Sequence, residues 1–363
     1  MKYDKSELCY IWLDSFLGLE YKHKQEIYNY IDGKHNIKNL IESAREYIIN
    51  EVGESIFNTI KNSATDSYLE YILKGLEDRG VVAVTMASTD YPDFLRETSI
   101  PPLVLYTKGD RSLLKAKTFA IVGSRKSLPL SLKLAENYTK ELIDAGYAIV
   151  TGIAEGVDCA VLKTAVENNG KVISVIAGGF DNVYPKSNQD LLNKVVESGL
   201  AISEYPPQTV PKPYQFPVRN RIIAGLATGV LIVSGAMKSG TLYTAEYAEE
   251  YGKDLFVIPY SAGVSSGAGC NDLIKRGAHL TDTPEDILNF YGQIKEQKQE
   301  DFSDAEREVL KALSDGEKHI EKLSVALKKN AYEITPILSI LEIKGIVVKS
   351  GNVYGLTRKY SEE

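Results

Sequence analysis

The sequence predicts an α/β protein with a doubly wound, mostly parallel sheet at its centre. Three features predict this fold class. Short apolar runs alternate with helical patterns between about residues 119 and 291, small residues follow several of those runs, and the segments on either side are patterned differently. Strands and helices that alternate at this spacing form a mostly parallel sheet with helices on both faces. A chain of 363 residues is long enough for two or three domains.

The first 80 residues are patterned as a small helical domain. Apolar residues recur at three- and four-residue intervals from Leu8 through Tyr68, Tyr71 and Ile72 to Leu76. The breaks between these short helices are expected near three glycines, Gly18, Gly33 and Gly53. Because the segment has many acids and no clean helical hairpin, we expect it to pack or to contact a partner rather than to bind DNA.

The central region, 81–292, begins with an extended segment from Val81 to Met86 and a strand from Leu103 to Tyr106. The parallel strands are then predicted at 119–122, 147–150, 172–177, 200–203, 229–233 and 255–258. Helices are predicted between them, around 132–143, 157–165, 191–196, 221–226 and 241–251. This order of elements is the one that a doubly wound sheet requires.

The last part of the chain, 302–363, follows a polar linker at 293–301. Ser303 and Glu306 have the spacing of a capping box at the start of a helix. Two further helical stripes and a hairpin with a Ser-Gly-Asn turn complete the pattern, which predicts a winged helix. The third helix carries two glutamates and little positive charge, so we expect it to contact protein or act as a lid rather than read a DNA groove.

The composition restricts the classes of function. A net charge of -7 argues against wrapping nucleic acid over the whole surface, but it permits a local basic groove. No apolar run approaches the ~20 residues needed to span a bilayer, and the first residues lack the apolar core of a signal peptide. Three scattered cysteines have no cysteine or histidine partners at metal-ligand spacing. We therefore expect a cytoplasmic protein with no membrane segment, no metal and no cofactor.

Gly123, Ser124 and Arg125 follow the first parallel strand directly. In an open α/β sheet, ligands collect at the carboxyl ends of the strands, where helix N-termini present free N–H groups. A small residue lets the backbone approach an anion, and an arginine adds a planar fork of donors that suits phosphate. The alternative is a tight turn with a solvated arginine.

Two later segments carry the same chemistry. The first runs through Lys212 and Phe216 to Arg219, Asn220 and Arg221, and it mixes aromatic side chains with cations. Single-stranded nucleic acid is bound by such sets, because bases stack on the rings and phosphates pair with the cations. The alternative is a loop whose aromatic rings pack inward and whose arginines form ordinary ion pairs.

The second segment is Lys238-Ser239-Gly240-Thr241, just before a helix. It lacks the Gly-x-x-x-x-Gly-Lys-Ser/Thr spacing of an ATP-hydrolysing loop. No Gly-x-Gly-x-x-Gly follows the strand that begins at Phe119, which weakens the case for a dinucleotide site.

Taken together and in order, six segments resemble the DprA/Smf family of DNA-processing proteins: 120–125, 152–158, 203–206, 216–221, 238–242 and 269–274. The resemblance extends over about residues 91–287. It implies a Rossmann-like core that forms a homodimer, flanked by a sterile-alpha-motif-like helical domain and a C-terminal winged helix. It also implies a protein that binds incoming single-stranded DNA and loads RecA onto it during natural transformation.

The resemblance also implies roles for individual residues. Arg125 matches the family's phosphate-contacting arginine, Phe216 matches an aromatic residue that meets a base, and Lys212 falls close to a lysine of the groove. The DNA-binding set that it implies is Gly123, Ser124, Arg125, Lys212, Phe216, Arg219, Asn220, Arg221, Lys238, Ser239 and Gly240. No catalytic residue is implied.

An enzyme is the alternative from another class, namely a phosphoribohydrolase of the lysine-decarboxylase-like type with a related core. Those enzymes use a Pro-Gly-Gly-x-Gly-Thr-x-x-Glu segment. The nearest segment here, 238–246, lacks the paired glycines and places its acid differently. No paired general acid and base is evident elsewhere, so the sequence favours a binding protein.

Overall fold

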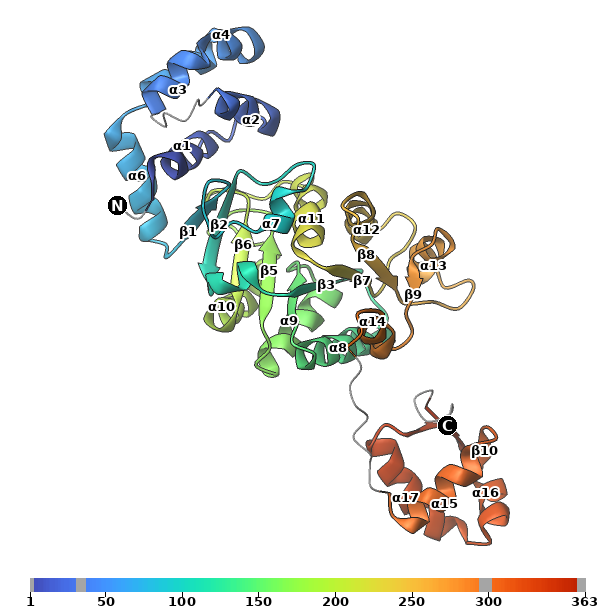
Figure 1. Cartoon of the computed structure of the whole chain (residues 1–363). Coiled ribbons are helices and arrows are strands. Elements are labelled where there is room, and N and C mark those ends of the chain that lie inside the picture. Colours follow the sequence, from blue (N-terminus) through green and yellow to red (C-terminus); the bar gives the residue numbers. More distant parts are fainter. Residues whose placement is uncertain (1–2, 31–36, 294–301, 358–363) are drawn as a thin grey trace. The chain divides into compact units, whose positions relative to one another are not determined.

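The computed structural model describes residues 3–30, 37–293 and 302–357 (Figure 1). The chain divides into two compact units, Met1–Ile294 and Lys295–Glu363. The predicted linker at 293–301 lies almost wholly outside the described residues. None of the described helices is long and apolar enough to cross a membrane.

Short helices form the first part of the larger unit. They are α1 (Lys5–Asp14), α2 (Tyr21–Asn29), α3 (Ile37–Ser43), α4 (Arg45–Tyr47), the π-helix η1 (Ile48–Val52), α5 (Glu54–Asn62) and α6 (Asp66–Glu77). Their core is made by Trp12, Ile27, Ile48 and Ile60, all completely buried. Gly53 separates η1 from α5 with φ at +109°, a conformation that favours glycine. Gly33 lies outside the described residues.

The predicted doubly wound sheet is confirmed. Nine strands lie in the order β1-β2-β6-β5-β4-β3-β7-β8-β9, and those from β6 to β9 are mutually parallel. The strands β1 and β2 add an antiparallel pair at one edge. The bounds are β1 (Val82–Thr85), β2 (Val104–Gly109), β3 (Thr118–Val122), β4 (Ala148–Thr151), β5 (Val172–Ile176), β6 (Leu200–Ser203), β7 (Gly229–Ile232), β8 (Asp254–Val257) and β9 (His279–Leu280).

Helices cover both faces of the sheet. The connecting helices are α8 (Pro129–Asp144), α9 (Val157–Glu167), α10 (Gln189–Ser198), α11 (Gln215–Leu226), α12 (Thr241–Glu250) and α13 (Ala268–Lys275), with α7 (Asp93–Arg96) and α14 (Pro284–Phe290) at the ends. Successive side chains of β3 point to opposite faces of the sheet, so the core has two halves. Phe119 and Ile121 pack with α8, α9 and α10 on one face. Ala120 and Val122 pack with α11, α12 and α13 on the other. Short 3₁₀ turns occupy η2 (Arg111–Lys115), η3 (Lys186–Asn188) and η4 (Ser265–Gly267).

The order of the strands creates a switch point between β3 and β7. From β3 the chain continues to β4, β5 and β6 on one side, then returns to place β7, β8 and β9 on the other. The connections after β3 and β7 therefore leave the sheet on opposite faces. A crevice between such connections, outside the carboxyl ends of the strands, is the usual ligand site of an open α/β sheet.

Helix α11 begins six residues earlier than the sequence predicted. Its first residue is Gln215, so Phe216, Arg219 and Asn220 lie on a helix and not on a loop. Pro217 is the third helical residue. Proline is tolerated in the first turn because the N–H groups there have no partner within the helix.

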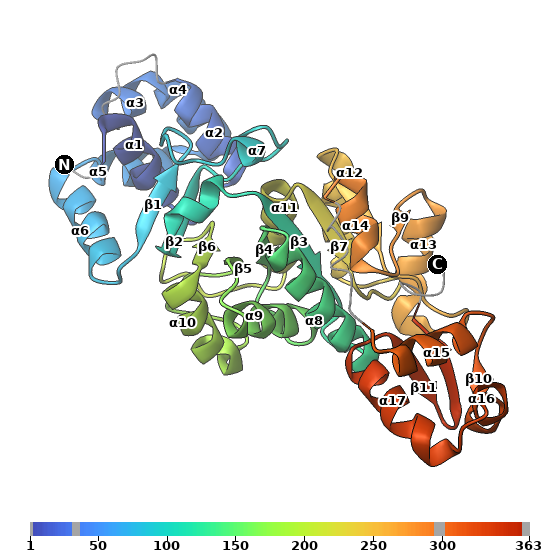
Figure 2. The same cartoon turned by 60° about the horizontal axis from the view of Figure 1, so that its bottom comes forward.

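The described part of the smaller unit, 302–357, contains three helices and a three-stranded antiparallel sheet, seen from a second direction in Figure 2. Its elements are α15 (Asp304–Leu313), β10 (Lys318–His319), α16 (Ile320–Leu327), α17 (Ala331–Ile343), β11 (Val347–Ser350) and β12 (Val353–Leu356). The predicted capping box of Ser303 and Glu306 is present. Val309, Leu323 and Leu338 are central to its core. The winged-helix assignment and the domain boundaries stay predictions.

Candidate functional site

A cavity of about 870 Å³ opens at the switch point between β3 and β7. Most of its lining comes from the turn after β3, the turn after β7 and the first half of α11, and the loops after β4, β5 and β6 and the starts of α9 and α12 contribute the rest. Nine of the eleven predicted residues are among those that line it, namely Gly123, Ser124, Arg125, Phe216, Arg219, Asn220, Lys238, Ser239 and Gly240. The fold thus brings together residues that are far apart in the sequence.

The turn after β3 is held by close packing. A Cβ atom on Gly123 would lie 2.5 Å from Cγ2 of Val157, so a side chain there would displace α9. The N–H of Ser124 donates to Oγ of Ser234, at the end of β7, over 3.1 Å. Ser127 adds a hydroxyl contact of 2.9 Å to the same Oγ. These hydrogen bonds therefore connect the turns after β3 and β7. The Ser124 N–H already has a hydrogen-bond acceptor within the protein.

The turn after β4 supports the turn after β3 from beneath. Gly156 has φ at +82°, and a Cβ on it would collide with the carbonyl oxygens of Ser124 and Arg125. The N–H of Val157, at the start of α9, donates to the Ser124 oxygen over 3.4 Å. Glycine is needed here both for its backbone conformation and for the close approach.

Arg125 and Phe216 form the mouth of the cavity. The guanidinium carbon of Arg125 lies 5.2 Å from the ring centre of Phe216, within the range of a cation–π contact. The Phe216 ring meets the ring of Tyr184 at 75° with 5.6 Å between centres. Arg125 is exposed and has no ion pair with any described residue. Its charge can therefore meet an anion, and the two rings offer faces and edges on which a base can stack.

Arg219 and Asp158 lie at the floor of the cavity. Their exposed fractions are only 5% and 6%. Nη1 of Arg219 donates to the carbonyl oxygen of Val175, and its Nε donates to Oδ1 of Asn220 over 3.1 Å. Oδ2 of Asp158 accepts from the N–H of Ala154 over 3.2 Å.

The two buried charges influence each other. Burial lowers the pKa of Arg219 to about 10, although the Asp158 carboxylate opposes that change. Burial raises the pKa of Asp158, and Arg219 opposes that change in turn. A Cβ on Gly152 would collide with Asp158 and lie 2.8 Å from Arg219, so this glycine leaves room for both groups.

Asp158 was missing from the predicted set. Its position just after a strand and at the start of α9 was a weak signal, because only the folded chain brings it beside Arg219.

The third side of the cavity is the turn before α12. Nδ2 of Asn220 donates to the Gly240 oxygen over 3.1 Å, which joins this turn to α11. Oγ of Ser239 accepts from the N–H of Thr241, the first residue of α12, over 3.1 Å. Lys238 is exposed and has no ion pair with a described residue. The positive end of the α12 dipole therefore lies beside a free lysine.

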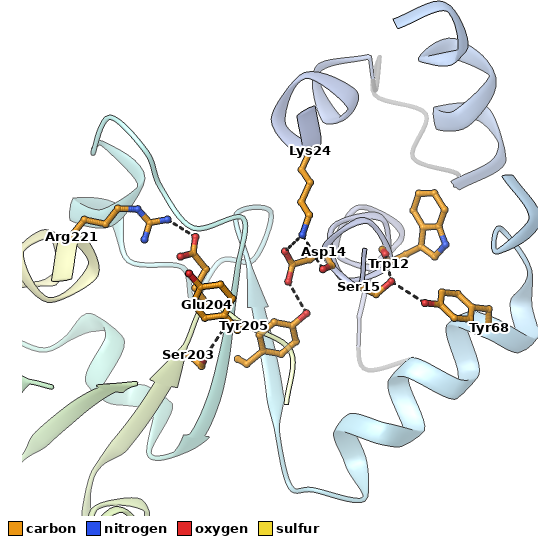
Figure 3. A network of polar contacts seen from close by, with 10 residues as sticks. Trp12, Asp14, Ser15, Lys24, Tyr68, Ser203, Glu204, Tyr205 and Arg221 are labelled. Atoms are coloured by element: carbon orange, nitrogen blue, oxygen red, sulfur yellow. Dashed lines mark hydrogen bonds and ion pairs between the residues drawn. The ribbon is translucent and has the colours of Figure 1, made fainter. Parts of the chain in front are cut away.

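Two predicted residues do not line the cavity. Lys212 is exposed between two lining prolines, and its N–H donates to the side chain of Gln215. Arg221 is only 2% exposed, and its Nη2 donates to Oε1 of Glu204 (Figure 3). Burial alone would lower the pKa of Arg221, but Glu204 raises it above its usual value. Arg221 is thus an internal partner of Glu204 outside the cavity lining, and its place in the DNA-binding set stays a prediction.

The cavity concentrates positive charge on a chain that is acidic overall. Its lining contains four cations, Arg125, Lys126, Arg219 and Lys238, and one acid, Asp158. The chain as a whole has a formal net charge of -7. Such a local excess favours an anionic ligand. Among the described residues, no group of three His, Cys, Asp or Glu side chains is placed to hold a metal ion.

Comparison with known proteins matches residues 82–292 to the family described as DNA recombination-mediator protein A. The chain is 37% identical over 232 residues to the DNA processing protein DprA of Bacillus subtilis, which covers 63% of this chain and 78% of that protein. The corresponding protein of Streptococcus pneumoniae is 41% identical over 198 residues, covering 54% of this chain and 70% of that protein.

The solved structures that are similar to this one include two DprA proteins. The X-ray structure of DprA from Streptococcus pneumoniae has a TM-score of 0.69 and 32% identity, covering 80% of this chain and 98% of its own. DprA from Helicobacter pylori, whose structure is described as showing a unique single-stranded DNA binding mode, has a TM-score of 0.52 and 30% identity. That similarity covers 58% of this chain and 95% of the Helicobacter protein.

Proposed function

The chain belongs to the DNA recombination-mediator protein A family, and from this membership we propose that it binds single-stranded DNA in the cavity between β3 and β7. One observation carries the proposal. Four cations and one acid line a cavity in which Arg125 and Phe216 form a cation–π pair. The excess of cations suits the phosphates of a nucleic acid, and the aromatic ring suits its unpaired bases.

Each group has a distinct part in the proposal. Arg125 and Lys238, both exposed and without a carboxylate partner among the described residues, contact phosphates. Phe216, with Tyr184 behind it, stacks on a base. Arg219 is held at the floor by hydrogen bonds to Val175 and Asn220. Its part is therefore to add positive potential and to fix the start of α11, and not to contact the strand directly.

The wider role that we propose is that of a recombination mediator that protects incoming strands and loads RecA onto them during natural transformation. It acts in the cytoplasm, as a homodimer joined through the central domain, and without catalysing a reaction. Family membership supports this role, as does the description of the Helicobacter pylori relative as a single-stranded DNA binder. Two linked cavities would hold a long strand far more tightly than one.

The test is an anisotropy titration of the full chain with single-stranded and duplex oligonucleotides at several salt concentrations. We expect a clear preference for the single strand, little dependence on base sequence, and affinity that falls with salt. Equal affinity for duplex would contradict the proposal. Hydrolysis of a nucleotide in the absence of DNA would instead favour the phosphoribohydrolase alternative.

A further inference from the structure

A second groove, of about 440 Å³, lies between α6 and the loop that follows β6. We call it the tyrosine groove. Tyr68, Tyr71 and Lys74 line it from α6, while Pro207 and Thr209 line it from the loop. It belongs to neither the cavity at the switch point nor any predicted site.

Of the tyrosines that line this groove, Tyr71 is exposed to solvent, Tyr68 is half-buried and Tyr106 is buried. The sequence pattern placed Tyr71 with the apolar positions of α6, yet its exposed fraction is 70%. Its ring stacks on that of Tyr68 at 25°, with 6.4 Å between centres. Tyr68 is fixed in turn by a 3.3 Å contact between its hydroxyl and Oγ of Ser15 (Figure 3). One ring is therefore held in place, and the other extends the stack into solvent.

The groove is lined by two cations, Lys74 and Arg79, and by one acid, Asp78. Lys74 is exposed and has no ion pair with a described residue. Arg79 is different, because its Nε contacts Oδ2 of Asp181 over 2.8 Å. Aromatic faces beside a free cation are the features that bind single strands without regard to sequence.

The loop after β6 contributes lining residues to both the tyrosine groove and the cavity at the switch point, and we call it the ridge. Thr209 lines the groove and Pro211 lines the cavity, so the two are separated by at most about 7 Å of extended chain. The ridge is held in place, because the N–H of Gly179 donates to the Thr209 oxygen and the N–H of Asp181 donates to the Pro207 oxygen, both over 2.9 Å. The short separation would let a strand that leaves the cavity over this loop continue into the groove.

We propose that the tyrosine groove is a second contact for single-stranded DNA, in which a base stacks on Tyr71 and a phosphate meets Lys74. This inference rests on the proposed function of the cavity and extends it to the helical part of the chain. Continuity across the ridge favours a strand over a peptide, since a strand bound in the cavity continues beyond it on both sides.

The test compares two strand lengths, ~20 nucleotides and ~4 nucleotides, the shorter being near the lower limit of known single-strand site sizes. Tyr71→Ala should weaken binding of the long strand about 5- to 140-fold, the equivalent of about 1–3 kcal/mol, and leave the short strand unchanged. Lys74→Gln should reduce the salt slope by about 0.7 for the long strand only. Tyr30→Ala, at an exposed tyrosine that lines neither cavity, is the matched control.

The outcomes separate the two proposals. If the wild-type chain binds neither strand, the proposed function fails and the extension fails with it. If the wild-type chain binds both strands and Tyr71→Ala changes neither affinity, the cavity stands and the tyrosine groove is not a DNA contact, which would favour a peptide there. Circular dichroism of Tyr71→Ala should match that of the wild type, because the side chain is mostly in solvent.

Discussion

The guanidinium of Arg125 lies over the ring of Phe216, 5.2 Å from its centre, although one residue follows β3 and the other lies in the first turn of α11. The two side chains meet because β3 is central in the sheet and α11 crosses the face beside it. The contact places a charge that has no ion-pair partner among the described residues over an aromatic ring in the lining of the cavity. Stacking on Phe216 and phosphate contact by Arg125 are two contributions to binding that can be separated by experiment.

Replacing Phe216 tests the stacking contribution. Phe216→Ala should weaken single-strand binding by about 1–3 kcal/mol while the salt dependence stays nearly constant, because stacking is little screened. Phe216→Tyr keeps the ring and should bind almost as the wild type does. Anisotropy titrations at three salt concentrations measure both quantities. A changed slope in Phe216→Ala would mean that the ring acts by orienting Arg125 rather than by stacking.

Replacing Arg125 tests the phosphate contribution. Arg125→Glu should weaken binding to every sequence and reduce the slope of log affinity against log salt by about 0.7 for each phosphate that the variant no longer neutralises. Lys140→Glu, at an exposed lysine of α8 that does not line the cavity, makes the same change in charge and controls for the overall field. Equal effects of the two substitutions would show that binding depends on net charge and not on this cavity.

The sequence predicted the sheet well because buried parallel strands are short apolar runs between glycine-containing turns. It predicted less of the site, for physical reasons that differ from residue to residue. The predicted helix began at Arg221, whereas α11 begins at Gln215 and its first turn accommodates Pro217. Asp158 and Arg219 gain their roles from burial beside each other, which no local pattern encodes. The two-residue strand β9 is defined by pairing with β8, so its sequence carries almost no signal of its own.

The partner of Arg221 was also not predictable from the local sequence. The structural role of this residue can be tested by experiment. Nη2 of Arg221 donates to Glu204, and the two side chains are only 3% and 14% exposed. Removing one member of a buried pair leaves the other charge uncompensated, so Arg221→Ala should lower the free energy of unfolding by about 3–5 kcal/mol. Thermal unfolding of the full chain measures the loss.

A double replacement separates folding from binding at this position. Arg221→Met combined with Glu204→Leu removes both charges and should be less destabilising than either single change. If the folded double variant binds single strands as the wild type does, Arg221 has only a structural role. A large loss of affinity in that variant would restore the role that the sequence suggested.

The C-terminal unit should show a pH dependence that originates at Glu306. A 2.6 Å hydrogen bond from Nζ of Lys344, together with the N–H and hydroxyl of Ser303, lowers the pKa of the Glu306 carboxyl from 4.5 to about 2. A lowered pKa in the folded state means that the unfolded state takes up the proton first. The stabilisation is therefore complete above about pH 4.5 and is lost as the pH falls towards 2.

Hydrogen exchange of peptides from α15 and α17 in the full chain reports the stability of this unit without requiring it to be isolated. Protection should fall as the pH decreases through that window, after correction for the intrinsic exchange rate. Glu306→Gln cannot lose a charge, so its protection should be lower at neutral pH and vary less between pH 4.5 and 2. Glu308→Gln, on the same helix but paired with Lys329 at the surface, is the control. A wild-type profile that matches Glu306→Gln at every pH would show that the contacts with Lys344 and Ser303 do not stabilise the unit.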